Sequence, residues 1–210
     1  MTAPMKTDWD SYYQKPYRTA SYSRAITAGE LAGMIARHAA PGLTVAEFGG
    51  ANSCFYDGLA ERFAPGRYAV LDNNDLGLRK FTERAGSGRA EALRADVLDF
   101  RGKPEFDLVF SVGLIEHFSP ALTLKAVEAH FLAAKPGGLV IISFPTPTLL
   151  YRLTRAAAEA LGLWIFHDER PLWLAEILPE IEKHGEVLES RIIWPIFLTQ
   201  TMVAARKKAL

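Results

Sequence analysis

The sequence contains one cysteine, no net charge and no long apolar run. Cys54 is the only cysteine among 210 residues, which rules out an internal disulfide and suits a reducing cytoplasm. The 24 Lys and Arg residues balance 24 Asp and Glu residues, so the composition gives no basic footprint for nucleic acid. No apolar run has the length of a membrane-spanning helix, and the polar, aromatic first residues predict no signal peptide. We expect a cytoplasmic single domain that does not bind nucleic acid.

The chain also lacks the full glycine pattern of a dinucleotide-binding turn. Residues 45–55 (VAEFGGANSCF) are typical of a buried strand that turns sharply into a helix. A pyrophosphate needs G-x-G-x-x-G there, but counted from Gly49 the later positions are Ala51 and Cys54. The carboxylate of Glu47 would repel a pyrophosphate, whereas it would attract a sulfonium nucleoside, which is positively charged. The turn therefore favours a sulfonium nucleoside over a nicotinamide dinucleotide.

Short apolar segments alternate with helical patterns along most of the chain. We expect strands at 43–48, 67–72, 90–95, 106–112 and 138–144. We expect helices at 27–39, 54–64, 75–86 and 120–134. This alternation predicts an α/β fold in which a mostly parallel sheet carries helices on both faces.

The alternation ends after Phe144, where the PTPT sequence of 145–148 cannot continue a strand. Two helices are expected next, at 149–166 and 171–183, and then two strands, at 187–193 and 197–205. Pro179 predicts a kink or a break in the second of these helices, and Pro195 lies between the two strands.

Acidic side chains follow two of the predicted strands. Asp72 ends the strand at 67–72, about 20 residues beyond the turn, where a carboxylate can accept hydrogen bonds from ribose hydroxyls. Asp96 stands at the end of the next strand and could accept from an adenine amino group. The simpler alternatives are a helix cap for Asp72 and a solvated loop acid for Asp96.

Six short segments resemble motifs of the class I S-adenosylmethionine-dependent methyltransferases in order and spacing. They are 47–51 (EFGGA), Asp72, 95–97 (ADV), 106–109 (FDLV), 115–118 (IEHF) and 135–138 (KPGG). The resemblance covers about 43–144 and departs from the family at Ala51 and Ser53, which replace glycines. It implies S-adenosylmethionine as the cofactor and a Rossmann-like, doubly wound sheet of seven strands with an antiparallel C-terminal hairpin. The cofactor-binding residues that it implies are Glu47, Gly49, Gly50, Ala51, Asp72, Asn73, Asp96, Val97 and Ser111.

The same resemblance divides the single domain, 1–210, into four parts. They are an aromatic N-terminal segment with a helix (1–42), a cofactor-binding core (43–144), a substrate-lid insertion after the fifth strand (145–185) and the terminal hairpin (186–210). We expect substrate contacts from Tyr13, Tyr17, Phe144, Trp164 and His167.

Two histidines are candidates for a general base. His117 follows the strand at 106–112 at the ligand edge of the sheet, and an imidazole takes a proton near neutral pH. His167 lies in a polar cluster beyond the first inserted helix. The alternatives are a capping or pocket-lining role for His117 and an ordinary surface loop for His167.

We expect no catalytic metal. Glu116 and His117 resemble the end of an E-x-x-E-H motif in metal-dependent members of the family, but the first glutamate position is Gly113. Two remaining ligands are too few to hold a divalent ion.

The leading functional hypothesis is methyl transfer to a small molecule, with oxygen acceptors slightly favoured over nitrogen or carbon. The alternatives are a non-catalytic binding or scaffold protein with this fold and a nicotinamide oxidoreductase. Residues 149–173, with an apolar stripe, could pack on the sheet edge, roof an apolar substrate pocket, or contact a membrane surface or a second copy of the chain.

Overall fold

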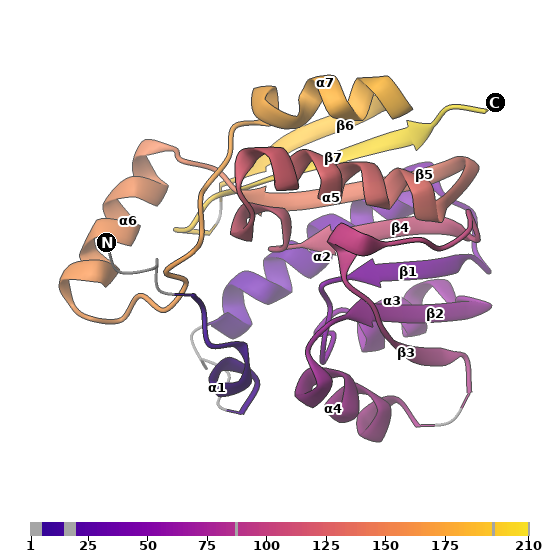
Figure 1. Cartoon of the computed structure of the whole chain (residues 1–210), viewed down its shortest axis with the longest axis horizontal. Coiled ribbons are helices and arrows are strands. Elements are labelled where there is room, and N and C mark those ends of the chain that lie inside the picture. The colour runs from indigo at the N-terminus through magenta and orange to yellow at the C-terminus, as the bar shows by residue number, and fades with distance from the viewer. Residues whose placement is uncertain (1–5, 15–19, 87, 195, 210) are drawn as a thin grey trace.

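A computed structural model describes residues 6–14, 20–86, 88–194 and 196–209, so Tyr17 and Pro195 lie outside the described residues. Its centre is a sheet of seven strands in the order β3-β2-β1-β4-β5-β7-β6 (Figure 1). The strands are β1 Thr44–Phe48, β2 Arg67–Asp72, β3 Ala90–Arg94, β4 Phe106–Val112, β5 Ala134–Pro145, β6 Gly185–Ile193 and β7 Gln200–Lys207. The first five run parallel, and β7 pairs antiparallel with both β5 and β6. The expected doubly wound sheet with a terminal antiparallel pair is confirmed.

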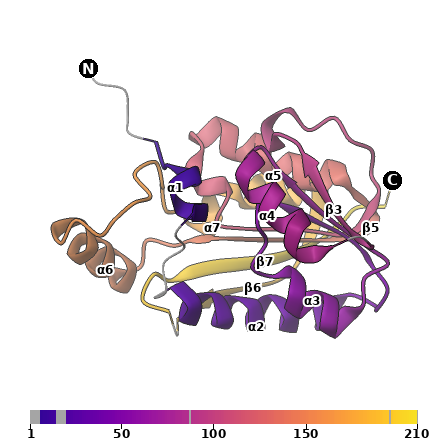
Figure 2. The ribbon, with the colours of Figure 1, turned by 90° about the horizontal axis from the view of Figure 1, so that it is seen from below.

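Helices cover both faces of this sheet. They are α1 Trp9–Gln14, α2 Ala20–His38, α3 Tyr56–Phe63, α4 Asp75–Ala85, α5 Pro120–Ala133, α6 Leu149–Ala160 and α7 Leu174–His184, with short 3₁₀ helices η1 Val97–Asp99 and η2 Ile115–His117. One buried cluster joins the sheet to α2, α3 and α4, and a second joins it to α5 and α7. Figure 2 shows α2 and α3 below the sheet and α7 on the other side.

Several boundaries differ from the sequence prediction; α6 ends at Ala160 rather than 166, and β7 spans Gln200–Lys207 rather than 197–205. α2 begins at Ala20 rather than 27. The sequence prediction missed its first turns because they lack the apolar spacing that marks Leu31 and Ile35. β5 begins at Ala134, and a register shift opposite Phe106 accommodates the PGG sequence of 136–138. α3 begins two residues late, at Tyr56, because the loop after β1 makes an additional turn.

The insertion at 145–185 consists of two unlike parts. α6 stands away from the sheet (Figure 1). α7 packs against α5, and the buried side chains of Ile177 and Ile181 on α7 and of Leu172 before it join the core. α7 continues through Pro179, so the helix is not broken there. The two isoleucines on either side of Pro179 hold this helix on the core. No helix in the described part of the chain combines the length and the apolar character that crossing a bilayer requires.

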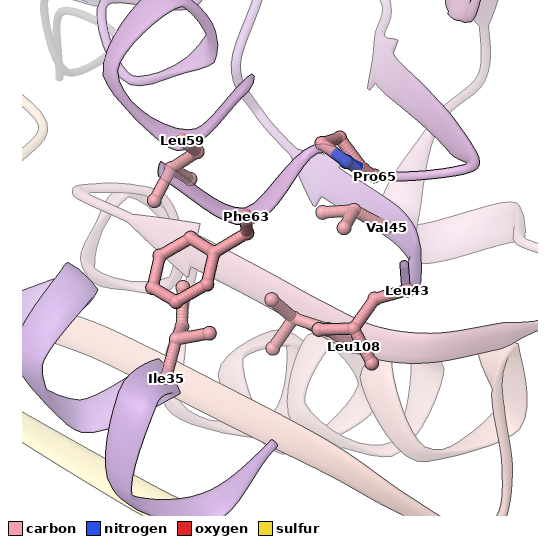
Figure 3. Close-up of a pocket in the computed structure, with 7 residues that line it drawn as sticks. All are labelled: Ile35, Leu43, Val45, Leu59, Phe63, Pro65 and Leu108. Atoms are coloured by element: carbon pink, nitrogen blue, oxygen red, sulfur yellow. The ribbon is translucent and has the colours of Figure 1, made fainter. Parts of the chain in front are cut away.

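A small apolar cavity lies between α2, α3 and the sheet. Figure 3 shows the side chains that line it, among them Ile35, Leu59 and Phe63. Its volume of about 10 Å³ is at the lower limit for one water molecule, and its lining offers no polar partner. This cavity is a packing defect of the core rather than a ligand site.

Candidate active site

The turn after β1 keeps an unusual backbone without its full set of glycines. Gly49 has φ +69°, and Ala51 and Ser53 also lie in the left-handed region, at +39° and +38°. A residue other than glycine in this region costs on the order of 1–3 kcal/mol, which the surrounding structure must offset. Ser53 N donates to Gly50 O at 2.6 Å, which closes the extra turn. An alanine and a serine therefore adopt backbone conformations here that glycine would adopt at lower cost.

Glu47 supports this turn from beneath. Its Oε2 accepts hydrogen bonds from Ser53 Oγ and Tyr68 Oη, both at 2.5 Å, and the side chain is 2% exposed. A Cβ at Gly50 would lie 2.5 Å from Glu47 Cδ, which explains the glycine there. Burial raises the pKa of Glu47 from 4.5 to about 7, against the effect of the two hydroxyl donors. Glu47 therefore braces the turn and does not face outward from it.

Asp72 links the ends of β1 and β2. Its Oδ2 accepts from Ala51 N at 3.0 Å and its Oδ1 accepts from Asn74 N at 2.7 Å. Burial raises the pKa of Asp72, and the backbone donors oppose that rise. A carboxylate has about four acceptor positions, so two remain for the hydroxyls of a ligand. Asn74 in turn caps α4 by accepting from Gly77 N.

The remaining predicted cofactor residues divide into two groups. Asn73 and Asp96 are exposed near the ends of β2 and β3, and Asp96 Oδ1 accepts from Leu98 N at 2.8 Å to cap η1. Val97 packs its side chain into the core. Ser111 is fully buried, and its hydroxyl contacts His130 Nε2 at 2.8 Å. The Ser111 side chain therefore lies inside the fold rather than at the ligand edge.

His117 lies at the same edge, after β4, at the end of η2. Its Nδ1 is 2.9 Å from Asp168 Oδ1, and its side chain is 8% exposed. A carboxylate can only accept, so Nδ1 carries the proton and Nε2 keeps its lone pair. Burial lowers the pKa of His117, although Asp168 acts in the opposite direction. Trp9 packs edge-on against the imidazole with ring centroids 5.0 Å apart. The arrangement is that of an oriented neutral base.

Two further carboxylates lie beside His117. Glu116 is 2% exposed, and its Oε1 is 3.9 Å from His117 Nε2. Glu169 accepts from the hydroxyl of Tyr151 on α6. Burial raises the pKa of Glu169 to about 7 and, with Glu169 and Asp168 nearby, raises that of Glu116 well above its ordinary range. Ligand atoms of Glu116, His117 and Glu169 all lie within 4.8 Å of one another.

The helix α1 lies between the Asp72 side of the site and the His117 side. Asn74 Nδ2 donates to Asp10 Oδ1 at 2.7 Å, and Lys80 Nζ donates to Tyr13 O at 2.5 Å. Burial, with Asp72 close by, raises the pKa of Tyr13. Residues 9–14 of the aromatic segment therefore lie against α4 and beside His117, as part of a flap over the site would.

The substrate residues expected from sequence are only partly together. Phe144 is fully buried in the core, and His167 is exposed; the two residues after His167 are the ones that reach His117 and Tyr151. Trp164 is buried under the guanidinium of Arg155, 4.8 Å from its ring centroid, and closes the loop back onto α6. Sequence reasoning missed Trp9, Asp168 and Glu169. Their only signal was membership of the aromatic N-terminal segment and of the polar cluster at 167–170.

No profile of a known protein family matches the sequence, and no curated protein matches it. Solved structures do match. Magnesium protoporphyrin IX methyltransferase from Synechocystis PCC 6803, solved with bound S-adenosylhomocysteine, has a TM-score of 0.74 at 16% identity and covers 95% of this chain and 94% of its own.

Two other structures show the same similarity. A possible exported protein from Bordetella parapertussis has a TM-score of 0.73 at 20% identity, over 100% of this chain and 77% of its own. The N-methyltransferase NodS from Bradyrhizobium japonicum WM9, with S-adenosylhomocysteine, has a TM-score of 0.64 at 14% identity, over 85% and 86%. This chain has the fold of the class I S-adenosylmethionine-dependent methyltransferases.

Proposed function

We propose that the protein binds S-adenosylmethionine and transfers its methyl group to a small molecule. One observation carries this proposal. The braced turn after β1, the carboxylate of Asp72 and the oriented His117 lie at one edge of the sheet, at the carboxyl ends of parallel strands. Two structures with this fold contain S-adenosylhomocysteine, the product that the cofactor leaves. The carboxylate of Asp72 suits a cofactor that carries positive charge and two ribose hydroxyls.

The acceptor side of the site is formed by His117 and its neighbours. In methyl transfer to oxygen, the acceptor attacks the methyl carbon, the carbon–sulfur bond breaks and S-adenosylhomocysteine leaves. The proton of the acceptor hydroxyl passes to Nε2 of His117, while Asp168 holds the other ring nitrogen. This available base is why we place oxygen acceptors slightly ahead of amines. Amines need only be neutral to react.

Methyl transfer from labelled S-adenosylmethionine to a panel of hydroxyl and amine acceptors tests the proposal. We expect His117→Ala to lower kcat by about 10²–10⁴-fold with nearly unchanged cofactor affinity. His184→Ala, at the far end of α7, is the matched control and should keep full activity. His167→Ala should have a much smaller effect than His117→Ala, because its ring is exposed. Cofactor binding without turnover on any acceptor would support the alternative, a non-catalytic binding protein.

The helix α6 borders the proposed acceptor site through its buried face, and its other face is apolar and exposed. Leu149, Leu153 and Leu161 are 73%, 61% and 72% exposed, so this stripe does not pack on the sheet edge. Tyr151 on the other side of the helix is buried and reaches Glu169 in the site. We propose that α6 closes over an apolar portion of the acceptor from its Tyr151 side. Contact with a membrane surface or with a second copy of the chain is the competing use of the helix, through its exposed leucine face.

A further inference from the structure

Three carboxylates and one imidazole form an acidic cluster, and the reaction proposed above uses only the imidazole and one of the carboxylates. The carboxylates belong to Glu116, Asp168 and Glu169, and the imidazole belongs to His117. In the described part of the chain, none of the three carboxylates forms an ion pair with a Lys or Arg side chain. Glu116 and Asp168 have ion-pair contacts with His117, and Glu169 accepts a hydrogen bond from the hydroxyl of Tyr151. Carboxylates this close together and this far from water repel one another unless a proton or a cation binds between them.

The imidazole of His117 faces this cluster in the orientation of a metal ligand. Asp168 fixes the proton on Nδ1, so the lone pair of Nε2 is directed to the side where Glu116 Oε1 lies 3.9 Å away. A histidine that ligates a metal through one nitrogen usually donates its other N–H to a carboxylate. Asp168 accepts the N–H of His117 Nδ1 in this way.

The two glutamates are held differently but meet at the same point. Glu116 Oε2 is buried and has no hydrogen-bond partner among the described residues, in a side chain that is 2% exposed. Glu169 is oriented by the hydroxyl of Tyr151. A buried carboxylate oxygen without a donor is costly, because nothing replaces the water that it has lost. A cation at this position would satisfy it.

The spacing fits a small divalent ion after a modest contraction. Ligands about 2.0–2.2 Å from a metal lie roughly 3–4.4 Å from one another. The ligand atoms of Glu116, His117 and Glu169 lie within 4.8 Å of one another, so shifts of well under about 1 Å in three side chains would close the site.

We propose that Glu116, His117 and Glu169 bind one divalent transition-metal ion, with Asp168 as the positioning residue for His117. One imidazole and two carboxylates are hard and borderline ligands, a set that suits Mn²⁺ or Zn²⁺. The sequence predicted only two ligands, Glu116 and His117, because only the segment after β4 was considered. The third ligand, Glu169, comes from the segment between α6 and α7.

The binding of the ion is independent of the proposed function, and only its use in catalysis rests on it. The ion and the acceptor proton would occupy the same lone pair of His117, so His117 is a base in the metal-free enzyme and a ligand in the metal-bound one. Comparing kcat in EDTA with kcat in Mn²⁺ distinguishes these two uses once binding is established.

Mn²⁺ titration of tag-free, cofactor-free protein, followed by the electron paramagnetic resonance signal of free Mn²⁺, tests the site directly. We expect one bound Mn²⁺ per chain. Glu116→Gln and Glu169→Gln should each weaken binding at least tenfold, and Asp168→Asn by about 10–100-fold. The matched control is Glu180→Gln, from a second group (Glu128, Glu180 and His184) in which Glu180 already pairs with His184 and Lys183. It should bind as the wild type does.

Thermal unfolding separates loss of the site from loss of the fold. Wild-type protein should melt at a higher temperature with Mn²⁺ than with EDTA, because the ion binds only the folded chain. Glu116→Gln should fold in EDTA at least as stably as the wild type and gain nothing from Mn²⁺. No binding by the wild type at about 1 mM Mn²⁺, where even a weak site would be half filled, would overturn the proposal. Equal weakening by Glu180→Gln and Glu116→Gln would also overturn it.

Discussion

The substitution Glu47→Gln tests whether the turn after β1 stands on a buried acid that is protonated near neutral pH. Glu47 is 2% exposed and receives two hydroxyl hydrogen bonds on one oxygen, which a glutamine carbonyl can also accept. Its pKa rises from 4.5 to about 7 on folding, because burial removes the hydration of the carboxylate. At about 1.4 kcal/mol for each pKa unit, the rise is worth about 3 kcal/mol.

The direction in which stability changes with pH follows from proton binding to Glu47. Between pH 4.5 and 7 the folded state holds a proton on Glu47 that the unfolded state has released, so this contribution is fully present below pH 4.5 and lost as pH rises through 7. Glutamine has no such loss. Relative to the wild type, Glu47→Gln should therefore gain up to about 3 kcal/mol in free energy of unfolding between pH 4.5 and pH 8.

Urea unfolding at several pH values, followed by fluorescence of the four tryptophans, measures this difference. Glu83→Gln, an exposed acid on α4, is the control and should show no comparable pH-dependent gain. A difference between Glu47→Gln and the wild type that stays constant from pH 4.5 to 8 would refute the reasoning, because Glu47 would then titrate alike in both states.

Three further predictions concern the turn, the ribose site and the flap. Asp72→Ala should weaken S-adenosylhomocysteine binding by about 1.5–3 kcal/mol in calorimetry. It should also lower stability, because Ala51 N and Asn74 N lose their acceptor. Asp99→Ala, which removes an exposed acid, is the control. Gly49→Val should reduce both stability and cofactor affinity, since φ is +69° and its Cβ would lie 2.7 Å from Leu114 Cδ1. If Gly49→Val bound the cofactor as tightly as the wild type does, the turn would not be part of the site. Hydrogen exchange at 9–14 and 149–173 should slow when S-adenosylhomocysteine and an acceptor bind, whereas equal exchange in both states would make these segments passive packing.

The fold was predictable from sequence because its signals are local. All the parallel strands except β3 have apolar cores, and β1 and β2 end in a turn or an acid that the sequence displays directly. Asp72 was found in this way, since its strand and its distance from the turn can both be counted. Periodicity shows that a helix has an apolar face but not what covers that face. The stripe on α6 therefore suggested packing, although Leu149 and Leu153 are exposed, while the helix that contains Pro179 belongs to the core.

The acceptor side of the site was less accessible to sequence reasoning, because its members come from distant segments. His117 meets Asp168 across 51 residues, and Thr7 reaches the same carboxylate across 161. No local spacing records these pairs. The sequence also singled out His167, whose neighbours Asp168 and Glu169 reach the site; alternate residues of a loop point in different directions, and composition cannot decide between them.

Calorimetric titration of the metal-free protein with S-adenosylmethionine, S-adenosylhomocysteine and NAD tests the central claim most directly. We expect both sulfur nucleosides to bind with one site per chain and NAD to give no binding heat, because the turn lacks the later glycines of a pyrophosphate site. Binding of NAD, or no binding of either sulfur nucleoside, would contradict the account.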